Sequence, residues 1–394
     1  MKKNSQKKNL KVLTIVNSLE MGGIEKTLLS CIERMDRKQV EMNICCFKEG
    51  GVLEKDFKKT GVQIFYIKKT GLIILDFIQL LFLLWKNPHQ IVHSRFGFTS
   101  GGFVLASKMV GIKSYVSIHN TSPSSFARLK KIPVVSGVLT IQLWIHRFIT
   151  KKFADRIIGH SKANLDANYP AWCSSDKFSL LYNGVNFQSI NSDEYQSDSL
   201  LQFLKSNHIV ILHIGSFRNQ KNHFFLVDVF AKLKTPNKQL ILVGDGSLLP
   251  KVKAKVKELK LDDQVLFAGK DVHLKQYFEA SNLFFFPSIQ EGLGNVLIEA
   301  QFFNKPICAS DIMPHHESVY PDYRKYFFKP TATEEAIISL ENLIDDLKSK
   351  EIEDATVHAK DFVEKNFSIQ AMSEHLCSLY RNEMKSNQII INEY

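Results

Sequence analysis

The chain has 394 residues, enough for about two domains, and its 44% hydrophobic and 23% charged residues are typical of an ordinary globular protein. The lysine-rich amino-terminal tail runs directly into an apolar strand, so we expect no signal peptide. Six cysteines occur without a Cys-x-x-Cys pair, and several lie in apolar runs. This pattern indicates reduced core thiols in a cytoplasmic protein.

The net charge of +11 is concentrated in the first half of the chain. Residues 1–200 carry 28 Lys and Arg against 15 Asp and Glu, a net charge of +13, whereas residues 201–394 carry 23 against 25, a net charge of −2. A basic half is typical of proteins that meet nucleic acid or an anionic membrane. No DNA- or RNA-binding pattern accompanies the charge. We therefore expect an anionic membrane surface as a partner, and no nucleic acid.

The first predicted unit is a strand at residues 10–17, a loop with Gly22 and Gly23, and a helix at residues 27–35. A glycine loop that opens a helix lets a phosphate approach the backbone amides. Many such turns bind nothing, so the glycine pair is a weak signal by itself. Further strands are predicted at residues 40–47 and 62–67.

Residues 72–85 are nearly all apolar but are too few to span a bilayer, which needs about 20. A core helix on the sheet is the favoured interpretation, and a helix lying in the membrane interface is the alternative. Strands follow at residues 91–95 and 115–120, and the second of these ends in His119. A histidine at the carboxyl end of a strand is well placed for chemistry, although a lone one is more often structural.

Residues 123–153 combine basic and aromatic side chains, including Arg128, Lys130, Lys131, Trp144 and Phe148. Two interpretations have equal weight: a helix at the headgroup region of a membrane, or a helix that covers the sheet with solvated ends. A strand at residues 156–160 follows, and the polar, serine-rich residues 188–206 are predicted to be a linker between domains.

The second domain opens with a strand at residues 209–214, after which come Gly215, Ser216 and, a few residues later, Lys221. Later strands end at further glycines, Gly244 and Gly269, and helices are predicted at residues 224–234, 251–259, 271–280, 334–347, 353–365 and 369–385. Asp262 and Asp263 are adjacent and precede a strand, so the chain shows no Asp-x-Asp metal motif.

Two carboxylates, Glu291 and Glu299, are separated by seven residues in a strand–loop–helix unit. An apolar strand at residues 283–286 leads to a Gly-x-Gly loop, and a helix at residues 296–303 follows, with Asn295 predicted as its N-cap. Free amides at the helix start would face phosphate or sugar oxygens. Glu299 would accept hydrogen bonds from ribose hydroxyls and Glu291 from a hexose. An isolated pair would be surface acids, but the whole unit together favours a binding site.

This stretch resembles family 4 of the nucleotide-sugar glycosyltransferases, whose signature is such a Glu-x7-Glu pair, and in particular the bacterial capsule and exopolysaccharide enzymes. The resemblance covers nearly the whole chain and is strongest over residues 209–311. It implies the α/β fold called GT-B, with two Rossmann-like doubly wound domains facing across a cleft. Residues 1–190 would bind the acceptor and residues 205–370 the donor. Residues 371–394 would form a helix that crosses back to the first domain.

The resemblance also implies roles for single residues. His119 would lie near the transferred sugar, and Lys221 and Glu291 would complete the catalytic set, with Lys221 on the donor phosphates. Ser117 stands where relatives often have a second histidine, and Ser216 where they usually have arginine, a loss that Arg218 would compensate. The implied donor site comprises Gly22, Gly23, Ser216, Arg218, Lys221, Gly244, Gly269, Glu291, Gly292, Leu293, Gly294, Asn295 and Glu299.

The implied reaction is the transfer of a sugar, with retention of configuration, from a nucleotide diphosphate sugar such as a UDP-sugar. The acceptor would be a hydroxyl of a glycan or of a lipid-linked molecule in bacterial surface polysaccharide synthesis. No cofactor and no metal is expected. The protein would be cytoplasmic and peripheral at the inner face of the membrane. The alternatives are an NDP-sugar 2-epimerase of the same fold and a non-catalytic binder of sugar nucleotides.

Overall fold

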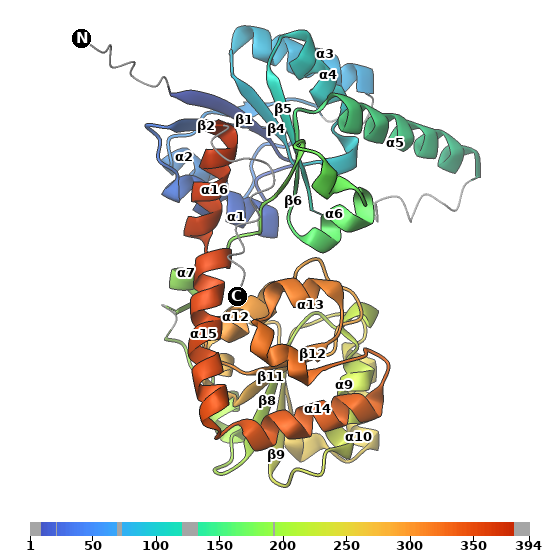
Figure 1. The fold of residues 1–394 in the computed structure, drawn as a ribbon, viewed down its shortest axis with the longest axis vertical. Coiled ribbons are helices and arrows are strands. Elements are labelled where there is room, and N and C mark those ends of the chain that lie inside the picture. The colour runs from blue at the N-terminus through green and yellow to red at the C-terminus, as the bar shows by residue number, and fades with distance from the viewer. Residues whose placement is uncertain (1–8, 21, 69–72, 120–132, 192–193, 382–394) are drawn as a thin grey trace. The chain divides into compact units, whose positions relative to one another are not determined.

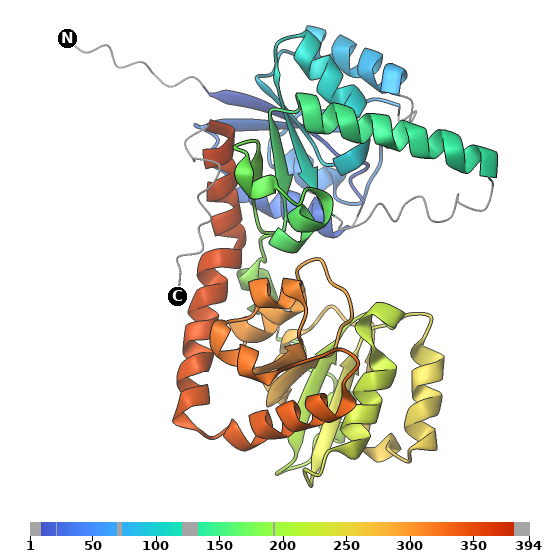
Figure 2. The same ribbon diagram turned by 45° about the vertical axis from the view of Figure 1, so that its right-hand side comes forward.

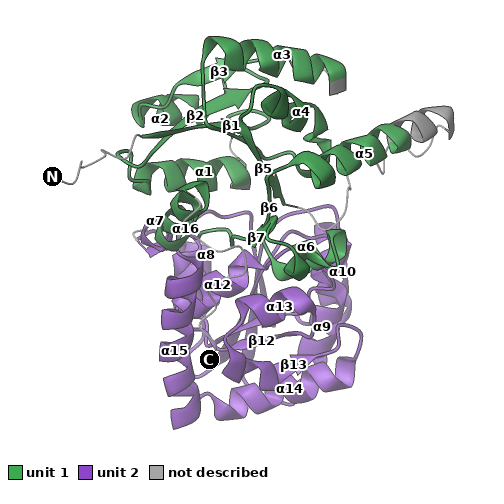
Figure 3. Ribbon diagram, turned by 45° about the horizontal axis from the view of Figure 1, so that its top comes forward, with its two compact units in different colours: residues 1–184, 369–394 green, residues 185–368 purple. Residues whose placement is uncertain are grey.

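The computed structural model describes residues 9–20, 22–68, 73–119, 133–191 and 194–381. The chain divides into two compact units, shown in two colours in Figure 3. Unit 1 comprises residues 1–184 and 369–394, and unit 2 comprises residues 185–368. Each unit is built around one parallel sheet with helices on both faces.

The sheet of unit 1 has seven strands in the order β3-β2-β1-β4-β5-β6-β7, and neighbouring strands are parallel. The strands are β1 (Leu10–Ile15), β2 (Val40–Cys46), β3 (Ile64–Tyr66), β4 (Ile91–Ser94), β5 (Lys113–Ile118), β6 (Arg156–Gly159) and β7 (Phe178–Leu180). Helices cover both faces, so the central strands are continuous apolar runs without polar alternation. Val12, Leu13 and Ile15 of β1 are completely buried, for example.

The helices of unit 1 form two layers. They are α1 (Gly23–Arg34), α2 (Glu54–Lys59), α3 (Ile73–Lys86), α4 (Gly101–Met109), α5 (Pro133–Phe153), α6 (Lys162–Asn168) and α16 (Ile369–Arg381). Helix α4 packs against both α3 and α5, and Figure 1 shows these three helices on one side of the sheet. Helices α1 and α16 pack together on the other face.

Helix α16 is far from the rest of unit 1 in sequence, yet it is part of that unit's core. Met372, Leu376 and Tyr380 are buried there. The Tyr380 hydroxyl lies 2.7 Å from Nδ1 of His93 on β4, and Ser373 Oγ donates to the Cys31 carbonyl of α1 over 3.1 Å. The core of unit 1 is therefore closed by residues from the far end of the chain.

The sheet of unit 2 has six parallel strands in the order β10-β9-β8-β11-β12-β13. They are β8 (Ile209–Ile214), β9 (Lys238–Val243), β10 (Val265–Gly269), β11 (Leu283–Phe286), β12 (Ile307–Ser310) and β13 (Phe327–Phe328). The direction in which successive strands are added reverses between β8 and β11. This reversal is a topological switch point, where open α/β sheets bind ligands at the carboxyl ends of their strands.

The helices of unit 2 are α7 (Phe187–Asn191), α8 (Asp198–Phe203), α9 (His223–Lys232), α10 (Leu249–Glu258), α11 (Lys275–Ala280), α12 (Asn295–Phe302), α13 (Met313–Ser318), α14 (Thr333–Asp346) and α15 (Lys350–Phe367). Residues 188–206, predicted as a linker, contain α7 and α8 among their described residues. Leu200 of α8 is completely buried in the core of unit 2. Phe203 and Leu204 also pack against this core, which the polar composition of the segment did not indicate.

Candidate active site

A cavity of about 460 Å³ opens in unit 2 at the switch point between β8 and β11. Its walls come from the loop after β8, the loop after β11 and the first turns of α12. The lining residues are Ile214, Gly215, Ser216, Lys221, Glu291, Gly292, Leu293, Gly294, Asn295, Val296 and Glu299. The structure thus gathers most of the sequence-predicted donor residues of the second domain into one cavity.

An ion pair joins the two catalytic candidates of this cavity. Lys221 Nζ lies 2.6 Å from Glu291 Oε1, and their side chains are only 19% and 12% exposed. The same Nζ is 4.6 Å from the ring centre of Phe286, the last residue of β11. Asn222 follows Lys221 in a left-handed conformation at φ 58°, which asparagine tolerates, and α9 starts there. Partial burial makes this pair stronger than a solvated surface pair.

Helix α12 begins one residue earlier than a cap at Asn295 would place it. Gly294 is the N-cap, in a left-handed conformation at φ 83°, and Asn295 is the first helical residue. The prediction of Asn295 as the cap is therefore wrong, because the turn needs a positive φ that glycine adopts without strain. No side chain caps the helix. The amides of its first turn remain at the cavity as an anion-binding end.

Glu299 lies one turn into α12 and lines the cavity. Burial raises the pKa of its carboxyl group from 4.5 to about 7. Among the described residues, the carboxyl has no hydrogen-bond or ion-pair partner. A desolvated acid without a partner is unfavourable in the empty protein, and it becomes a strong acceptor when ligand hydroxyls enter.

Three glycines end neighbouring strands at this edge of the sheet. A Cβ at Gly244 would lie 2.1 Å from the carbonyl oxygen of Gly215, and Gly244 has a φ of 144°. Its amide donates to the Gly269 carbonyl over 2.7 Å. Gly215 lines the cavity, whereas Gly244 and Gly269 are not among its lining residues. Glycine at position 244 is thus required by close backbone approach.

Arg218, predicted to compensate for the arginine missing at Ser216, is not among the residues that line the cavity. Ser216 lines the cavity, whereas Arg218 is exposed and does not line it. Lys221 is the only basic residue among those that line the cavity. In this structure, therefore, a phosphate in the cavity would meet Lys221 and the start of α12.

Buried histidines surround Lys221, and the sequence analysis did not select them. Burial lowers the pKa of His213, His223 and His315, to about 4 for His223 and about 3 for His315, and the charge of Lys221 adds to each effect. These rings are therefore neutral at physiological pH. Nothing in the sequence separates them from ordinary core histidines, because His213 and His315 lie on other segments than Lys221 and His223, two residues after Lys221, begins an apolar helix.

The remaining predicted site residues belong to unit 1 and lie at the carboxyl edge of its own sheet. Gly22 is the N-cap of α1 and Gly23 its first residue, again without a side-chain cap. His119 follows β5, and its ring stacks on His160 with centroids 4.2 Å apart. Burial, with help from the neighbouring rings and Arg95, holds the pKa of His119 well below its ordinary value. Ser117 binds His93 Nε2 over 2.8 Å.

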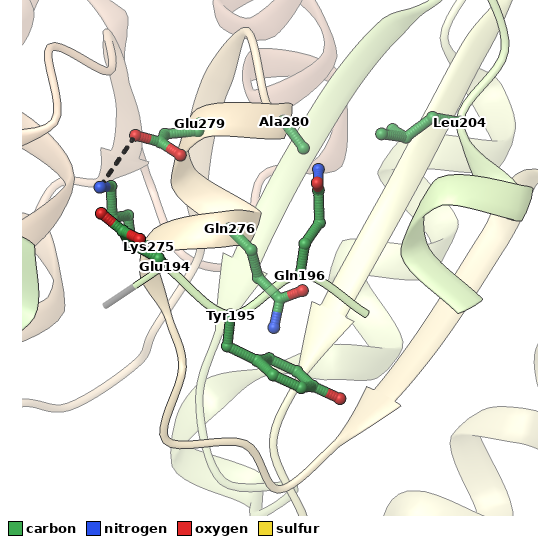
Figure 4. A pocket seen from close by; sticks show the side chains of 8 residues that line it. All are labelled: Glu194, Tyr195, Gln196, Leu204, Lys275, Gln276, Glu279 and Ala280. Atoms are coloured by element: carbon green, nitrogen blue, oxygen red, sulfur yellow. Dashed lines mark ion pairs between the residues drawn. The ribbon is translucent and has the colours of Figure 1, made fainter. Parts of the chain in front are cut away.

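A second cavity of about 390 Å³ in unit 2 is shown in Figure 4. Its lining comes from α11 and from the segment that leads through α8. It comprises Glu194, Tyr195, Gln196, Leu204, Lys275, Gln276, Glu279 and Ala280. Its lysine, Lys275, is paired with Glu279 at 3.7 Å and donates to the Asn191 carbonyl. It lacks the unpartnered carboxyl and the open helix end of the first cavity.

These two parallel-sheet units, with a cavity at the switch point of the second, have the GT-B fold. Solved structures share the whole fold. HepE from Anabaena in complex with UDP matches with a TM-score of 0.75 and 18% identity, covering 95% of this chain and all of that one. The lipopolysaccharide outer core galactosyltransferase WaaB matches with a TM-score of 0.70 and 18% identity, with 95% and 100% covered.

The chain belongs to family 4 of the nucleotide-sugar glycosyltransferases. Residues 21–189 match the model described as Glycosyltransferase Family 4, and residues 202–361 match Glycosyl transferases group 1. The chain is 25% identical to the putative glycosyltransferase EpsF of Bacillus subtilis over 78% of this chain and 80% of that one. It is 26% identical to the capsular polysaccharide biosynthesis glycosyltransferase CapH of Staphylococcus aureus over 78% and 83%.

A third relative is the UDP-Gal:alpha-D-GlcNAc-diphosphoundecaprenol alpha-1,3-galactosyltransferase of Escherichia coli, which is 24% identical over 83% of this chain and 86% of that one. The predictions of the GT-B fold, of the family and of a glycosyltransferase are confirmed. The alternatives of an epimerase and of a non-catalytic binder find no support among these relatives.

Proposed function

We propose that the enzyme transfers a sugar, with retention of configuration, from a UDP-sugar to a hydroxyl group of a lipid-linked acceptor in bacterial surface polysaccharide synthesis. The observation that carries this proposal is the cavity of unit 2, where an unpartnered Glu299 stands beside the open end of α12 and the Lys221–Glu291 pair. The names of the relatives support the substrates. The E. coli enzyme uses UDP-Gal and a diphosphoundecaprenol acceptor, and HepE binds UDP.

Different residues of the cavity bind different parts of the donor. Glu299 accepts hydrogen bonds from the ribose hydroxyls, and Glu291 accepts from the sugar. The first-turn amides of α12 and the Lys221 ammonium hold the diphosphate. As the bond between the anomeric carbon and the diphosphate oxygen breaks, negative charge grows on the diphosphate and Lys221 offsets it. The acceptor oxygen takes the same face of the sugar, and its proton leaves with the UDP.

The proposal includes catalysis without a metal ion. Among the described residues, no group of three or more His, Cys, Asp or Glu side chains could hold one. The Lys221 ammonium and the start of α12 supply the positive charge that a metal provides in other enzymes that cleave nucleotide sugars.

We also propose that unit 1 binds an anionic membrane surface. The outer faces of α3 and α5 carry exposed apolar side chains, with Trp85 77% and Trp144 66% exposed. On each face a lysine ammonium lies over an aromatic ring: Lys86 Nζ is 4.3 Å from the ring centre of Phe82, and Lys152 Nζ is 5.5 Å from that of Phe148. Aromatic rings beside cations suit the interface between headgroups and acyl chains.

The burial of single side chains shows which side of α3 lies on the sheet and which side is exposed. Leu80 and Leu84 are buried against the sheet, whereas Ile74, Ile78 and Phe82 are exposed. The helix is thus a core element on one side and an apolar surface on the other. Figure 2 shows α3 and α5 again on one side of the sheet of unit 1. No helix in the described part of the chain is long and apolar enough to cross a membrane.

The predicted basic-aromatic segment at residues 123–153 lies partly outside the described residues, which hold none of Phe126, Arg128, Lys130 and Lys131. The described part, within α5, carries Arg147, Lys151 and Lys152 toward its carboxyl end. Each Lys or Arg near an anionic leaflet contributes about 1 kcal/mol to binding. Such a surface holds the enzyme beside an acceptor whose lipid lies in the membrane.

The experiment that tests the proposed reaction measures UDP released by the purified protein from a panel of UDP-sugars. We expect release only when a sugar-diphosphate-lipid acceptor is present, and a product whose new bond keeps the donor's anomeric configuration by NMR. Release that is unchanged without the acceptor, conversion of the donor to its 2-epimer, or an inverted product would contradict the proposal. A thermal-shift screen of nucleotide sugars identifies the donor beforehand, because a ligand that binds the folded state raises its stability.

A further inference from the structure

Three side chains that carry nitrogen donors or acceptors meet at the carboxyl edge of the sheet of unit 1. Arg95, His119 and His160 each follow directly after one of the neighbouring strands β4, β5 and β6. The register pairs Ile118 with Gly159, so His119 and His160 lie side by side, and it pairs Ser94 with Val116, so Arg95 lies beside Ser117, two residues before His119. The rings of His119 and His160 stack with centroids 4.2 Å apart.

The three side chains share one face of the sheet. His93 and Ser117, each two residues before a member of the cluster, are joined by a hydrogen bond of 2.8 Å. Because side chains alternate along strands, Arg95 and His119 fall on that same face. The face is covered by α1 and α16, since His93 also contacts Tyr380 of α16. The uncapped first turn of α1 follows β1, the strand next to β4.

Arg95 is a buried cation, and the described residues supply no counter-ion for it. Arg95 is only 8% exposed, and its Nε and Nη2 atoms are buried without a hydrogen-bond partner among the described residues. None of the described acidic residues forms an ion pair with it. Its backbone amide donates to the Ile15 carbonyl over 3.1 Å, which fixes the residue at the end of β1. Buried donors of this kind are normally satisfied, because an unpaired one is costly.

The two histidines present nitrogens of the opposite character. His160 Nδ1 donates to the Leu181 carbonyl over 2.7 Å, and burial lowers the pKa of this ring to about 3, so its Nε2 is a neutral acceptor. That Nε2 is buried without a partner among the described residues, as is Nε2 of His119. His119 is partly exposed, so the cluster is open to solvent on that side.

We propose that Arg95, His119 and His160 form a binding site for a phosphate group carried on a sugar. The guanidinium donates from Nε and Nη2 to two phosphate oxygens, the bidentate geometry that arginine favours. The histidine nitrogens exchange hydrogen bonds with the neighbouring sugar hydroxyls. The inference rests on the proposed function because the phosphate source is its diphosphate-linked acceptor; the donor, whose diphosphate is assigned to the cavity of unit 2, serves as the comparison ligand.

The test compares the wild type with Arg95→Met and Arg95→Lys. Calorimetry with UDP, UDP-glucose and N-acetylglucosaminyl diphosphate on a short lipid chain measures affinity. We expect Arg95→Met to raise the Kd of the phosphate source that uses the site by about 10- to 100-fold, the range for a hydrogen-bonded charge. Arg95→Lys keeps the positive charge but loses the paired N–H donors of the guanidinium, so the Kd of this variant should also rise several-fold. Lys113→Met, an exposed residue at the amino end of β5, is the matched control.

A second readout separates binding from a structural role. Removing an unpaired buried charge should raise the Tm of ligand-free Arg95→Met above that of the wild type. A change confined to the lipid-linked diphosphate supports the site, and a change confined to UDP and UDP-glucose overturns it. Unchanged affinity for all three ligands, or a lowered Tm with unchanged affinity, overturns the inference. If the Arg95 variants keep the affinity and the turnover of the wild type, this site is refuted and the proposed reaction stands. If ligand affinity depends on Arg95 but no sugar is transferred, the proposed reaction is refuted and this site stands.

Discussion

Replacing Glu299 by glutamine should stabilise the folded protein at alkaline pH while it damages donor binding. The folded state holds this carboxyl in a desolvated position that raises its pKa from 4.5 to about 7. At 1.36 kcal/mol for each pH unit, that difference corresponds to about 3 kcal/mol. Below pH 4.5 the acid is protonated in both states and has no effect. Between pH 4.5 and 7 the unfolded chain loses the proton first, so stability falls as pH rises, and above pH 7 the full penalty is present.

The glutamine variant has no such penalty because its amide does not titrate. Urea unfolding of both proteins at pH 5 and pH 8 should therefore show a small difference at pH 5, with the variant more stable by up to about 3 kcal/mol at pH 8. Because the other titrating groups are common to both proteins, the difference isolates Glu299. Glu364→Gln, an exposed acid on α15, serves as the control and should change stability by less than about 0.5 kcal/mol at either pH.

The same variant should lose donor affinity, since a ligand hydroxyl bonded to a carboxylate contributes about 1.5–3 kcal/mol. Glu299→Ala should weaken the donor in the same way. In the wild type, the donor Kd should also rise as pH falls below 7, because the protonated acid is a poorer acceptor. A stability difference that is equal at pH 5 and pH 8 would refute the argument from burial. Unchanged donor binding in calorimetry with an intact fold would refute the assignment of Glu299.

Four further predictions concern the cavity and the surface of unit 1. Lys221→Ala should lower kcat/KM more than it raises the donor Kd, because the lysine acts on charge that appears in the transition state; equal losses would mean uniform binding. Arg218→Ala should lower kcat/KM similarly if this exposed side chain moves to the phosphates, and a silent variant would remove it from the donor site. Dialysis against EDTA should leave transfer unchanged, and activity lost with EDTA and restored by Mg²⁺ or Mn²⁺ would contradict the metal-free proposal. The protein should sediment with anionic liposomes and be released at high salt. Phe82→Ser with Trp85→Ser should weaken this binding, whereas Val357→Ser on α15 should not. Equal binding to neutral liposomes, or none to anionic ones, would show another use for that surface.

The local sequence by itself determined the unit around the two carboxylates. Strand β11, the Gly-x-Gly loop and helix α12 are contiguous, and their signals lie within a few residues of one another. Apolar runs ending at glycines located the other strands, because strands buried on both faces carry no polar residues. Glu299 could be placed in the site from spacing alone, since its distance from the loop is set by the rise of one helix.

Tertiary structure decided the contacts between segments that no local pattern joins. Lys221 and Glu291 are 70 positions apart and meet because β8 and β11 are neighbours at the switch point. His93 meets Tyr380 across 287 positions because α16 closes the core of unit 1. The raised pKa of Glu299 likewise depends on burial, which many distant residues create together.

Two further features illustrate why the sequence was insufficient. Helix α3 is apolar on nearly every side, so periodicity could not show that Leu80 would be buried and Trp85 exposed. The strand end at Arg95 and the one at His160 each look ordinary in the sequence, since polar residues commonly end strands. Only the parallel register of β4, β5 and β6 brings a guanidinium that no described acid pairs with close to two neutral imidazoles, because strand order is a property of the whole sheet.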